Sequence, residues 1–459
     1  CCEALLLTNP RIDRETVESV KGTIVEGTCK WITHDVKYRA WLNSDGTSNG
    51  DTRLLCISGG PGKGKTMLSV FLTKELEKHT AGVYNAELAF FFCSAQDPKR
   101  NTAVAVLRGL IHQILSKRPQ LVKHAQEYFK TPEQTQQTLL SLEALWLIFN
   151  KLAEDVDLGN MFCVLDGLDE CDEDTHRLLV PRILRLLSSE GSTQDSEQRP
   201  STFKLAIVSR EIPCLQKCTK QLNLDNKEMA SDIERVVSTR VDELSHIPGF
   251  NEELRAQVQK KLLQRAEGTF LWVGFAVHEL SQKKTCTEVF TALESLPRGL
   301  NGIYSRMLLR IPAEQRQDSI AILRWVTLAV RPLKLQELAV ALGVQPLHPL
   351  SLEQAISDKI TEFGPFLKVQ ESTVGLVHQS AREYLLREQE DSDVVLEAFR
   401  VRPQNGHLLI VQLSLDCVAQ SGFQQEVVDL ESPPSQESPL LQYAAIHWPQ
   451  HARSCATLD

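Results

Sequence analysis

Residues 59–66 read GGPGKGKT, and this motif constrains the fold of the chain more than any other feature. It follows the apolar run RLLCIS and precedes the amphipathic stretch TMLSVFLTKELEKH, so a buried strand, a glycine-rich turn and a helix are expected in that order. Glycines let a backbone wrap closely round phosphate oxygens, and the start of a helix adds partial positive charge. The motif therefore predicts a phosphate-binding loop made of Gly59, Gly60, Pro61, Gly62, Lys63, Gly64, Lys65 and Thr66.

Two side chains of the loop have chemistry of their own. In loops of this pattern the lysine, here Lys65, reaches the β and γ phosphates of a nucleoside triphosphate. The hydroxyl of the following residue, Thr66, is expected to ligate Mg²⁺.

A second motif, FCVLDGLDE at residues 162–170, is an apolar strand that ends in acids. Asp166 is expected at the carboxyl tip of a parallel strand, where open α/β sheets bind ligands, and there it can hold Mg²⁺. Asp169 and Glu170 are candidates to orient or deprotonate an attacking water. Alternatively, the acidic run 169–174 caps the helix that follows, and the two roles are compatible.

Further short apolar runs alternate with amphipathic stretches up to about Pro213, which predicts a parallel α/β sheet. One predicted strand, residues 89–95, lies between the two motifs, as expected for the P-loop class with an added central strand. The last run, FKLAIVSR, ends in Ser209 and Arg210. Arg210 could sense the charge of the γ phosphate, or it could form an ion pair with a neighbouring acid.

Helical patterns dominate after Pro213, and the runs FLKVQ and TVGLVHQ predict a β-hairpin of the kind found in a winged helix. We therefore expect an α/β P-loop domain followed by a helical domain and a winged-helix-like domain. The predicted segments are a lead-in at 1–50, the P-loop domain at 51–215, the helical domain at 216–315, the winged-helix-like domain at 316–390 and a helical segment at 391–459.

Net charge, hydropathy and cysteine content limit the partners, the location and the metal sites that we expect. The net charge of −9 disfavours a general surface for nucleic acid or anionic membrane. No apolar run reaches the ~18 residues that a membrane-spanning helix needs, so we expect a cytoplasmic protein. The twelve cysteines are scattered, are interpreted as reduced, and predict no metal site.

GGPGKGKT, the strand tip DGLDE and the strand ending in SR together resemble the NACHT domain of fungal NOD-like receptors, a branch of the STAND class of P-loop NTPases. The segments GTFLWV, LPRGLNGIY and VHQSAREYL resemble the helical and winged-helix parts of those receptors. The resemblance implies that ADP holds an off state and that ATP or GTP permits oligomerisation. It also implies that His378 contacts the β phosphate of the resting nucleotide, although an isolated histidine between apolar residues is also typical of a core position.

These features predict a regulatory NTPase that hydrolyses ATP or GTP slowly, with Mg²⁺, in signalling of the innate-immunity or heterokaryon-incompatibility type. The expected partners are further copies of the chain on activation, and other signalling proteins that bind effector and repeat regions lying outside this chain. Two alternatives stay open: an adaptor that binds nucleotide without hydrolysis, and a P-loop remodelling ATPase. The acids at Asp169 and Glu170 disfavour the first, and the acidic net charge disfavours the second.

Overall fold

The computed structural model describes residues 2–43, 53–188, 202–215, 221–224, 227–345, 348–421 and 438–456. The chain divides into two compact units, Cys1–Ser295 and Leu296–Asp459. The five predicted segments are finer than this division and stay a prediction. Among the described residues, no helix is both long enough and apolar enough to cross a bilayer.

The first unit is built on a parallel five-stranded sheet with the order β2-β3-β4-β1-β5. This arrangement confirms the predicted fold class, because β4 lies between the strand that precedes the phosphate loop, β1, and the strand that ends in Asp166, β3. The predicted strand at 89–95 is β2, which lies at an edge of the sheet and not at its centre. The strands are β1 (Leu54–Ser58), β2 (Ala86–Phe92), β3 (Asn160–Asp166), β4 (Thr202–Ser209) and β5 (Gln221–Asn223).

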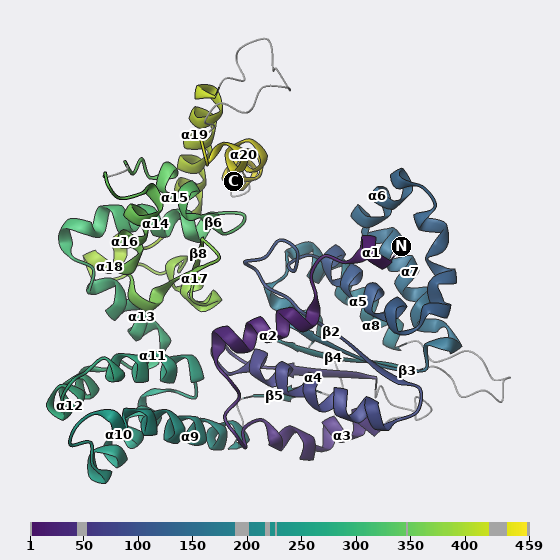
Figure 1. The fold of residues 1–459 in the computed structure, drawn as a ribbon, viewed down its shortest axis with the longest axis horizontal. Helices are drawn as coiled ribbons and strands as arrows, with labels where there is room; N and C mark the ends of the chain where they lie inside the picture. The colour runs from purple at the N-terminus through teal and green to yellow at the C-terminus, as the bar shows by residue number, and fades with distance from the viewer. Residues whose placement is uncertain are drawn as a thin grey trace. The chain divides into compact units, whose positions relative to one another are not determined.

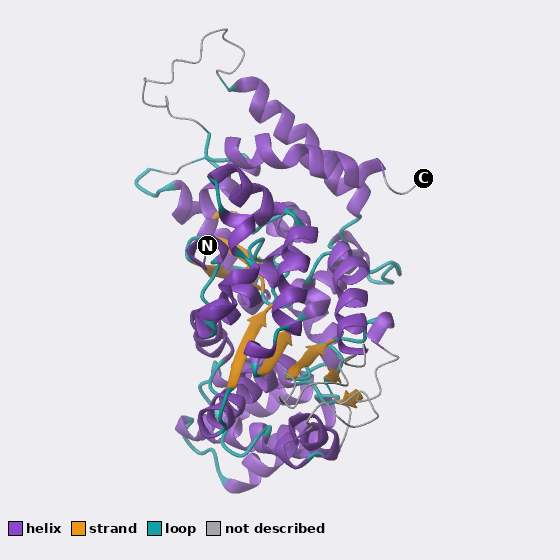
Figure 2. Cartoon of the chain, turned by 90° about the vertical axis from the view of Figure 1, so that its right-hand side faces the viewer, coloured by secondary structure: helices purple, strands orange, loops and turns teal. Residues whose placement is uncertain are grey.

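Helices cover both faces of this sheet (Figures 1 and 2). Alternate residues of each strand point to opposite faces, so Leu54 and Cys56 of β1 join one core while Leu55 and Ile57 join the other. The first core contains side chains of α5 (Ala103–Lys117), α7 (Leu142–Glu154) and α8 (Val180–Ser188), and the second contains side chains of α3 (Val36–Asn43) and α4 (Lys65–Gly82).

The first unit contains further α-helices. They are α1 (Cys2–Leu5), α2 (Pro10–Lys21), α6 (Pro132–Leu140), α9 (Lys227–Asp242), α10 (Glu252–Arg265), α11 (Phe270–Ser281) and α12 (Cys286–Ser295). The strand β5 was not predicted, because its three residues, QLN, form no apolar run.

The second unit combines helices with a small antiparallel sheet of order β6-β8-β7. The predicted hairpin is confirmed: β7 (Leu367–Gln370) and β8 (Thr373–Leu376) are joined by Glu371 and Ser372, which both have positive φ, as a two-residue hairpin turn requires. The other elements are α13 (Gly299–Leu309), α14 (Arg316–Leu328), β6 (Leu333–Lys334), α15 (Leu335–Ala341), α16 (Leu352–Thr361), α17 (Gln379–Leu385), α18 (Val394–Ala398), α19 (Pro403–Gln420) and α20 (Leu441–Ala456).

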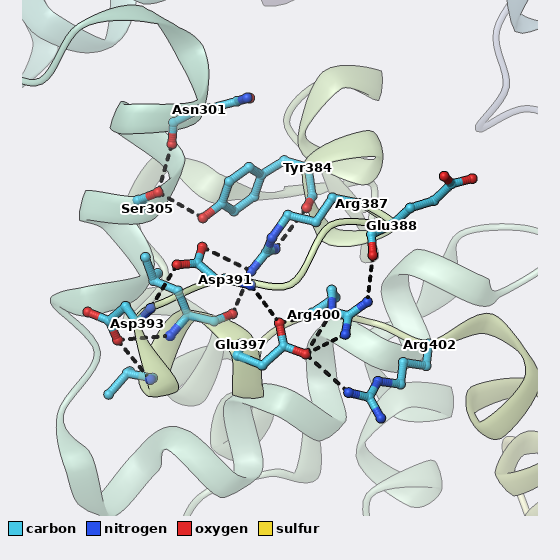
Figure 3. A network of polar contacts seen from close by, with 12 residues as sticks. Asn301, Ser305, Tyr384, Arg387, Glu388, Asp391, Asp393, Glu397, Arg400 and Arg402 are labelled. Carbon is cyan, nitrogen blue, oxygen red and sulfur yellow. Dashed lines mark hydrogen bonds and ion pairs between the residues drawn. The ribbon is translucent and has the colours of Figure 1, made fainter.

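Polar contacts connect α13, α17 and α18 within the second unit (Figure 3). The Tyr384 hydroxyl lies 2.8 Å from that of Ser305, and Arg387 donates to the carbonyl oxygen of Leu396 at 2.7 Å. A hydrogen bond from Arg400 lowers the pKa of Glu397 to about 2. These contacts join the end of α17 to the helices on either side of it.

A buried ion pair in the second unit supports a stability prediction. Both Glu337 oxygens accept from Arg331, at 2.7 and 2.8 Å, and the carboxylate also accepts the N–H of Lys334 at the start of α15. Arg331→Ala leaves a carboxylate that is almost fully buried without its cation, so we expect it to destabilise this unit by roughly 3 to 5 kcal/mol in urea unfolding.

The pH dependence of that ion pair provides the control. Burial raises the pKa of Glu337, but the hydrogen bonds and charge of Arg331 outweigh burial and leave it lower than usual. The pair therefore stabilises the unit at pH values above the pKa that Glu337 has in the unfolded chain. This contribution is lost as the pH falls through the lower pKa that Glu337 has in the folded chain. Arg331→Ala should remove that acid sensitivity. If unfolding of the variant and of the parent chain respond equally to acid, the ion pair does not stabilise the unit.

Candidate nucleotide site

The phosphate loop connects β1 to α4, as the sequence predicts. Gly62 and Gly64 have φ of 71° and 78°, values that favour glycine. The N–H of Gly59 donates to the carbonyl oxygen of Ser209 at the tip of β4, and the N–H of Phe270 donates to that of Gly62. The loop is thus attached to the sheet on one side and to the start of α11 on the other.

The two lysines of the loop point to different partners. Lys65, the first residue of α4, donates from Nζ to the carbonyl oxygens of Gly59 and Gly60, each at 2.9 Å, so its ammonium lies within the curve of the loop. Burial lowers its pKa, while the charge of Asp169 opposes that shift. Lys63 instead donates to the carbonyl oxygen of Glu267 at 3.2 Å, in the turn before α11.

Asp166 is the last residue of β3 and is only 3% exposed. Its Oδ1 accepts a hydrogen bond of 2.7 Å from the hydroxyl of Ser69, which lies one turn after Thr66 on α4. Burial raises the pKa of Asp166, and hydrogen bonds from Ser69 and Thr66 oppose this. Sequence reasoning missed Ser69, although its position three residues after Thr66 places both hydroxyls on one helix face.

The oxygen atoms of Thr66 and Asp166 fit Mg²⁺, a hard cation that takes few protein ligands and completes its shell with water and phosphate oxygens. The hydrogen bond between the Thr66 hydroxyl and the Asp166 carboxylate places these two groups together at the loop. No group of three or more His, Cys, Asp or Glu side chains suited to a metal occurs among the residues that the structure describes.

The two acids after the strand differ in their partners. Asp169 accepts the backbone N–H of Arg210 at 2.9 Å and pairs with its Nε at 3.2 Å, which is the ion-pair alternative for Arg210. Glu170 accepts only a backbone N–H, from Ala95 at 3.2 Å, among the contacts described for its carboxylate. Burial raises the pKa of Glu170, the charge of Lys21 opposes that shift, and the charges of Asp166 and Asp169 add to it. The geometry therefore favours Glu170 over Asp169 as a proton acceptor.

The capping role proposed for the acidic run 169–174 is performed by Asp172, a member of that run. Asp172 accepts the backbone N–H of Thr175 at 2.8 Å, where the next helical segment begins. Asp169 and Glu170 make no such contact in the described part of the chain.

An apolar cavity of about 160 Å³ lies beside the phosphate loop, and sequence reasoning missed it. It is enclosed by the start of α4, by residues of the lead-in segment, and by α9 and α11. Asp232 of α9 holds the lead-in in place, accepting the N–H of Cys29 at 2.8 Å and the indole N–H of Trp31 at 3.1 Å. The residues that line the cavity include Ile24, Trp31, Gly64, Met67, Phe270 and Gly274.

His378 belongs to the second unit, where it precedes α17. Its Nδ1 accepts the backbone N–H of Ser380 at 3.1 Å and lies 2.8 Å from the Ser380 hydroxyl, so the imidazole caps this helix. The contact with a β phosphate that the resemblance implies for His378 stays a prediction.

Two family models match the chain. Residues 27–210 match the family described as Nephrocystin 3, N-terminal, and residues 305–397 match the winged helix domain of GPI inositol-deacylase. The second match covers the β7–β8 hairpin and α17, which supports the predicted winged-helix-like region.

The vegetative incompatibility protein HET-E-1 of Podospora anserina is 29% identical over 487 aligned residues, covering 99% of this chain. The chain spans about a third of that relative, 34% of its length. Two solved structures show weaker likeness. The Walker-type ATPase paby2304 of Pyrococcus abyssi has a TM-score of 0.35 at 13% identity and covers 77% of this chain and 94% of its own. The ADP form of the Aeropyrum pernix ORC2 protein has a TM-score of 0.35 at 12% identity and covers 76% and 88%.

The resemblance proposed from the motifs is thus supported by a match along nearly the whole chain and by a parallel sheet with β4 between β1 and β3. Together these matches support a fungal NACHT-type P-loop NTPase, the family that the sequence motifs resemble.

Proposed function

We propose that the chain is a nucleotide-dependent signalling switch that binds ATP or GTP with Mg²⁺, hydrolyses it slowly, and thereby controls its own oligomerisation in the cytoplasm. The observation that carries this proposal is the grouping of Lys65, Asp166 and Glu170 at the carboxyl edge of one sheet. The charges of Asp166 and Glu170 act to raise the pKa of Lys65, and the charge of Asp166 acts to raise the pKa of Glu170. A binding-only adaptor has no need for a buried carboxylate at the position of Glu170. The HET-E-1 relative supports a role in incompatibility-type signalling.

Each residue has a distinct task in this proposal. The loop N–H groups and the Lys65 ammonium bind the phosphates, and Thr66 and Asp166 hold Mg²⁺, with Ser69 fixing the Asp166 carboxylate. When bound, Mg²⁺ neutralises charge on the phosphate oxygens. Glu170 accepts the proton of the attacking water, and Asp169 holds Arg210 close to the tip of β4, where its cation can face the γ phosphate.

The experiment that tests the switch follows the nucleotide and the assembly together. Nucleotide released from the purified protein is identified by chromatography. Single-turnover hydrolysis is measured with labelled ATP and with labelled GTP. Particle size is measured by light scattering in the presence of ADP and in the presence of a non-hydrolysable triphosphate. We expect bound ADP, slow hydrolysis, and larger particles only with the triphosphate. Binding without hydrolysis would indicate the adaptor alternative, and an unchanged particle size would contradict the switch.

We further propose that the apolar cavity receives the base of the nucleotide, since it opens beside Gly64 at the start of α4. A Cβ added at Gly274 meets no heavy atom within 4 Å, so Gly274→Ala fits and serves as the control. Gly274 lines the cavity, so Gly274→Leu places a larger apolar side chain at its wall. We expect it to weaken binding of ATP and GTP at least roughly tenfold, through lost burial of the base, while inorganic tripolyphosphate binds as before.

Calorimetry with the three ligands distinguishes the outcomes. Equal loss of tripolyphosphate binding would mean that Gly274→Leu disturbs the phosphate loop. Unchanged ATP and GTP binding would place the base elsewhere.

A further inference from the structure

The strand β2 lies at an edge of the sheet, where Ala86 is 8% and Leu88 is 2% exposed. It pairs with β3 alone among the described strands. The carbonyl oxygen of Asn85 accepts from Asn160 and the N–H of Cys93 donates to Asp166, so the peptide groups of odd-numbered residues face β3. In a parallel ladder the alternate residues face the other way.

The hydrogen bonds of Phe90 confirm this direction. Its N–H donates to Oε1 of Gln113 at 3.1 Å, and its carbonyl oxygen accepts from Nε2 of the same side chain at 2.9 Å. The Gln113 amide thus occupies the edge at Phe90 as a neighbouring strand would. The peptide groups of Ala86 and Leu88 point to the same side and have no such side chain beside them in the described part of the structure.

These residues form the floor of a groove of about 800 Å³, which we call the β2 groove. Its walls are α2, beside β2 in Figure 1, and the ends of α4 and α5. α2 begins at this groove, where Asn9 caps it, so the partial positive charge of the helix start also faces the groove.

The charged side chains that line the β2 groove are three cations, Arg11, Arg14 and Lys117, and two acids, Glu77 and Glu87, which leaves an excess of one positive charge. Arg14 is 7% exposed; its guanidinium stacks on the ring of Phe90 and its Nη1 pairs with Glu77 at 2.9 Å. Its Nε is buried and has no partner among the described residues, and the same holds for Nδ1 of His112. Arg11 and Lys117 add two cations, of which Lys117 pairs with Glu87 at 3.3 Å.

We propose that the β2 groove docks an extended acidic segment of a partner protein, which adds to the sheet beside β2. Its backbone pairs with the peptide groups of Ala86 and Leu88, and its carboxylate accepts from Nε of Arg14 and from His112. The strand edge selects a peptide over a small anion, because only a peptide can pair with the peptide groups of β2 and also supply a carboxylate to the buried donors.

The probe comes from a phage-displayed library of short random peptides, which is selected for binding to the full chain in the presence of ADP and Mg²⁺. The enriched peptide is then synthesised with a fluorescein label, and its binding is measured by fluorescence anisotropy. We expect an acidic residue flanked by β-branched residues. Arg14→Gln should weaken binding about tenfold or more, as loss of a charge-assisted hydrogen bond does. Methylation of alternate peptide amides should weaken it similarly, because it blocks strand pairing.

Because Arg14→Gln also removes the ion pair with Glu77, Arg11→Glu at the exposed rim gives a second test, with its melting temperature checked against the parent chain. Lys99→Glu, an exposed cation beyond the other end of β2, is the matched control and should bind as the parent does. The proposal is overturned if no sequence is enriched, if Arg11→Glu and amide methylation leave binding unchanged, or if free succinate displaces the peptide at equal concentration.

Discussion

Lys65→Ala is expected to abolish measurable binding of ATP and GTP while the chain stays folded. In the structure the Lys65 ammonium lies within the phosphate loop, held by the carbonyl oxygens of Gly59 and Gly60, and burial already disfavours its charge. A bound triphosphate supplies several anionic oxygens to this cation, and each charge-assisted hydrogen bond contributes roughly 1.5 to 3 kcal/mol. Calorimetry with both nucleotides measures the loss.

Lys63→Ala is the matched control, because Lys63 belongs to the same loop but donates to the carbonyl oxygen of Glu267. We expect it to retain most of the affinity. Parent-like affinity in Lys65→Ala, with the fold verified by circular dichroism, would reject the assignment of the phosphate loop.

Glu170→Gln is expected to bind nucleotide normally and to hydrolyse it about 10² to 10⁴ times more slowly, the range that general-base catalysis contributes. The amide keeps the shape of the side chain and can still accept the N–H of Ala95, but it cannot take a proton from water. Single-turnover assays with saturating protein separate hydrolysis from binding. Asp172→Asn is the control, since Asp172 caps Thr175 and asparagine caps equally well.

The pH dependence gives an independent check on Glu170. Burial raises the pKa of its carboxyl above the usual value of 4.5, and only the ionised form is a base. Hydrolysis by the parent chain should therefore fall as pH is lowered through that raised pKa, and the residual hydrolysis by Glu170→Gln should lack this step. If Glu170→Gln turns over at the parent rate, Asp169 or another group performs the proton transfer.

Much of the candidate site was predictable because its residues are adjacent in the sequence. A strand, a glycine-rich turn and a helix position Lys65 and Thr66 by local geometry, and an apolar strand that ends in an acid positions Asp166. The hairpin of β7 and β8 was predictable for the same reason, since two short apolar runs are separated by two residues.

Tertiary structure decided the features that depend on residues far apart in the chain. The sequence left two roles open for Arg210, and its ion pair with Asp169 depends on β4 lying beside β3. Ser69 became a partner of Asp166 because α4 packs on β3. The edge position of β2 was equally hidden, because strand order in a sheet is set by how crossover helices pack and not by strand order along the chain.

The sequence by itself indicated the phosphate loop, the acid-tipped strand and the family resemblance, because each rests on short contiguous segments whose chemistry is local. Only the tertiary structure decided that Asp169 pairs with Arg210 while Glu170 accepts the N–H of Ala95, and that the apolar cavity and the β2 groove form. Such features arise where segments distant in the sequence pack together, and the burial that creates them also sets the pKa of the acids inside.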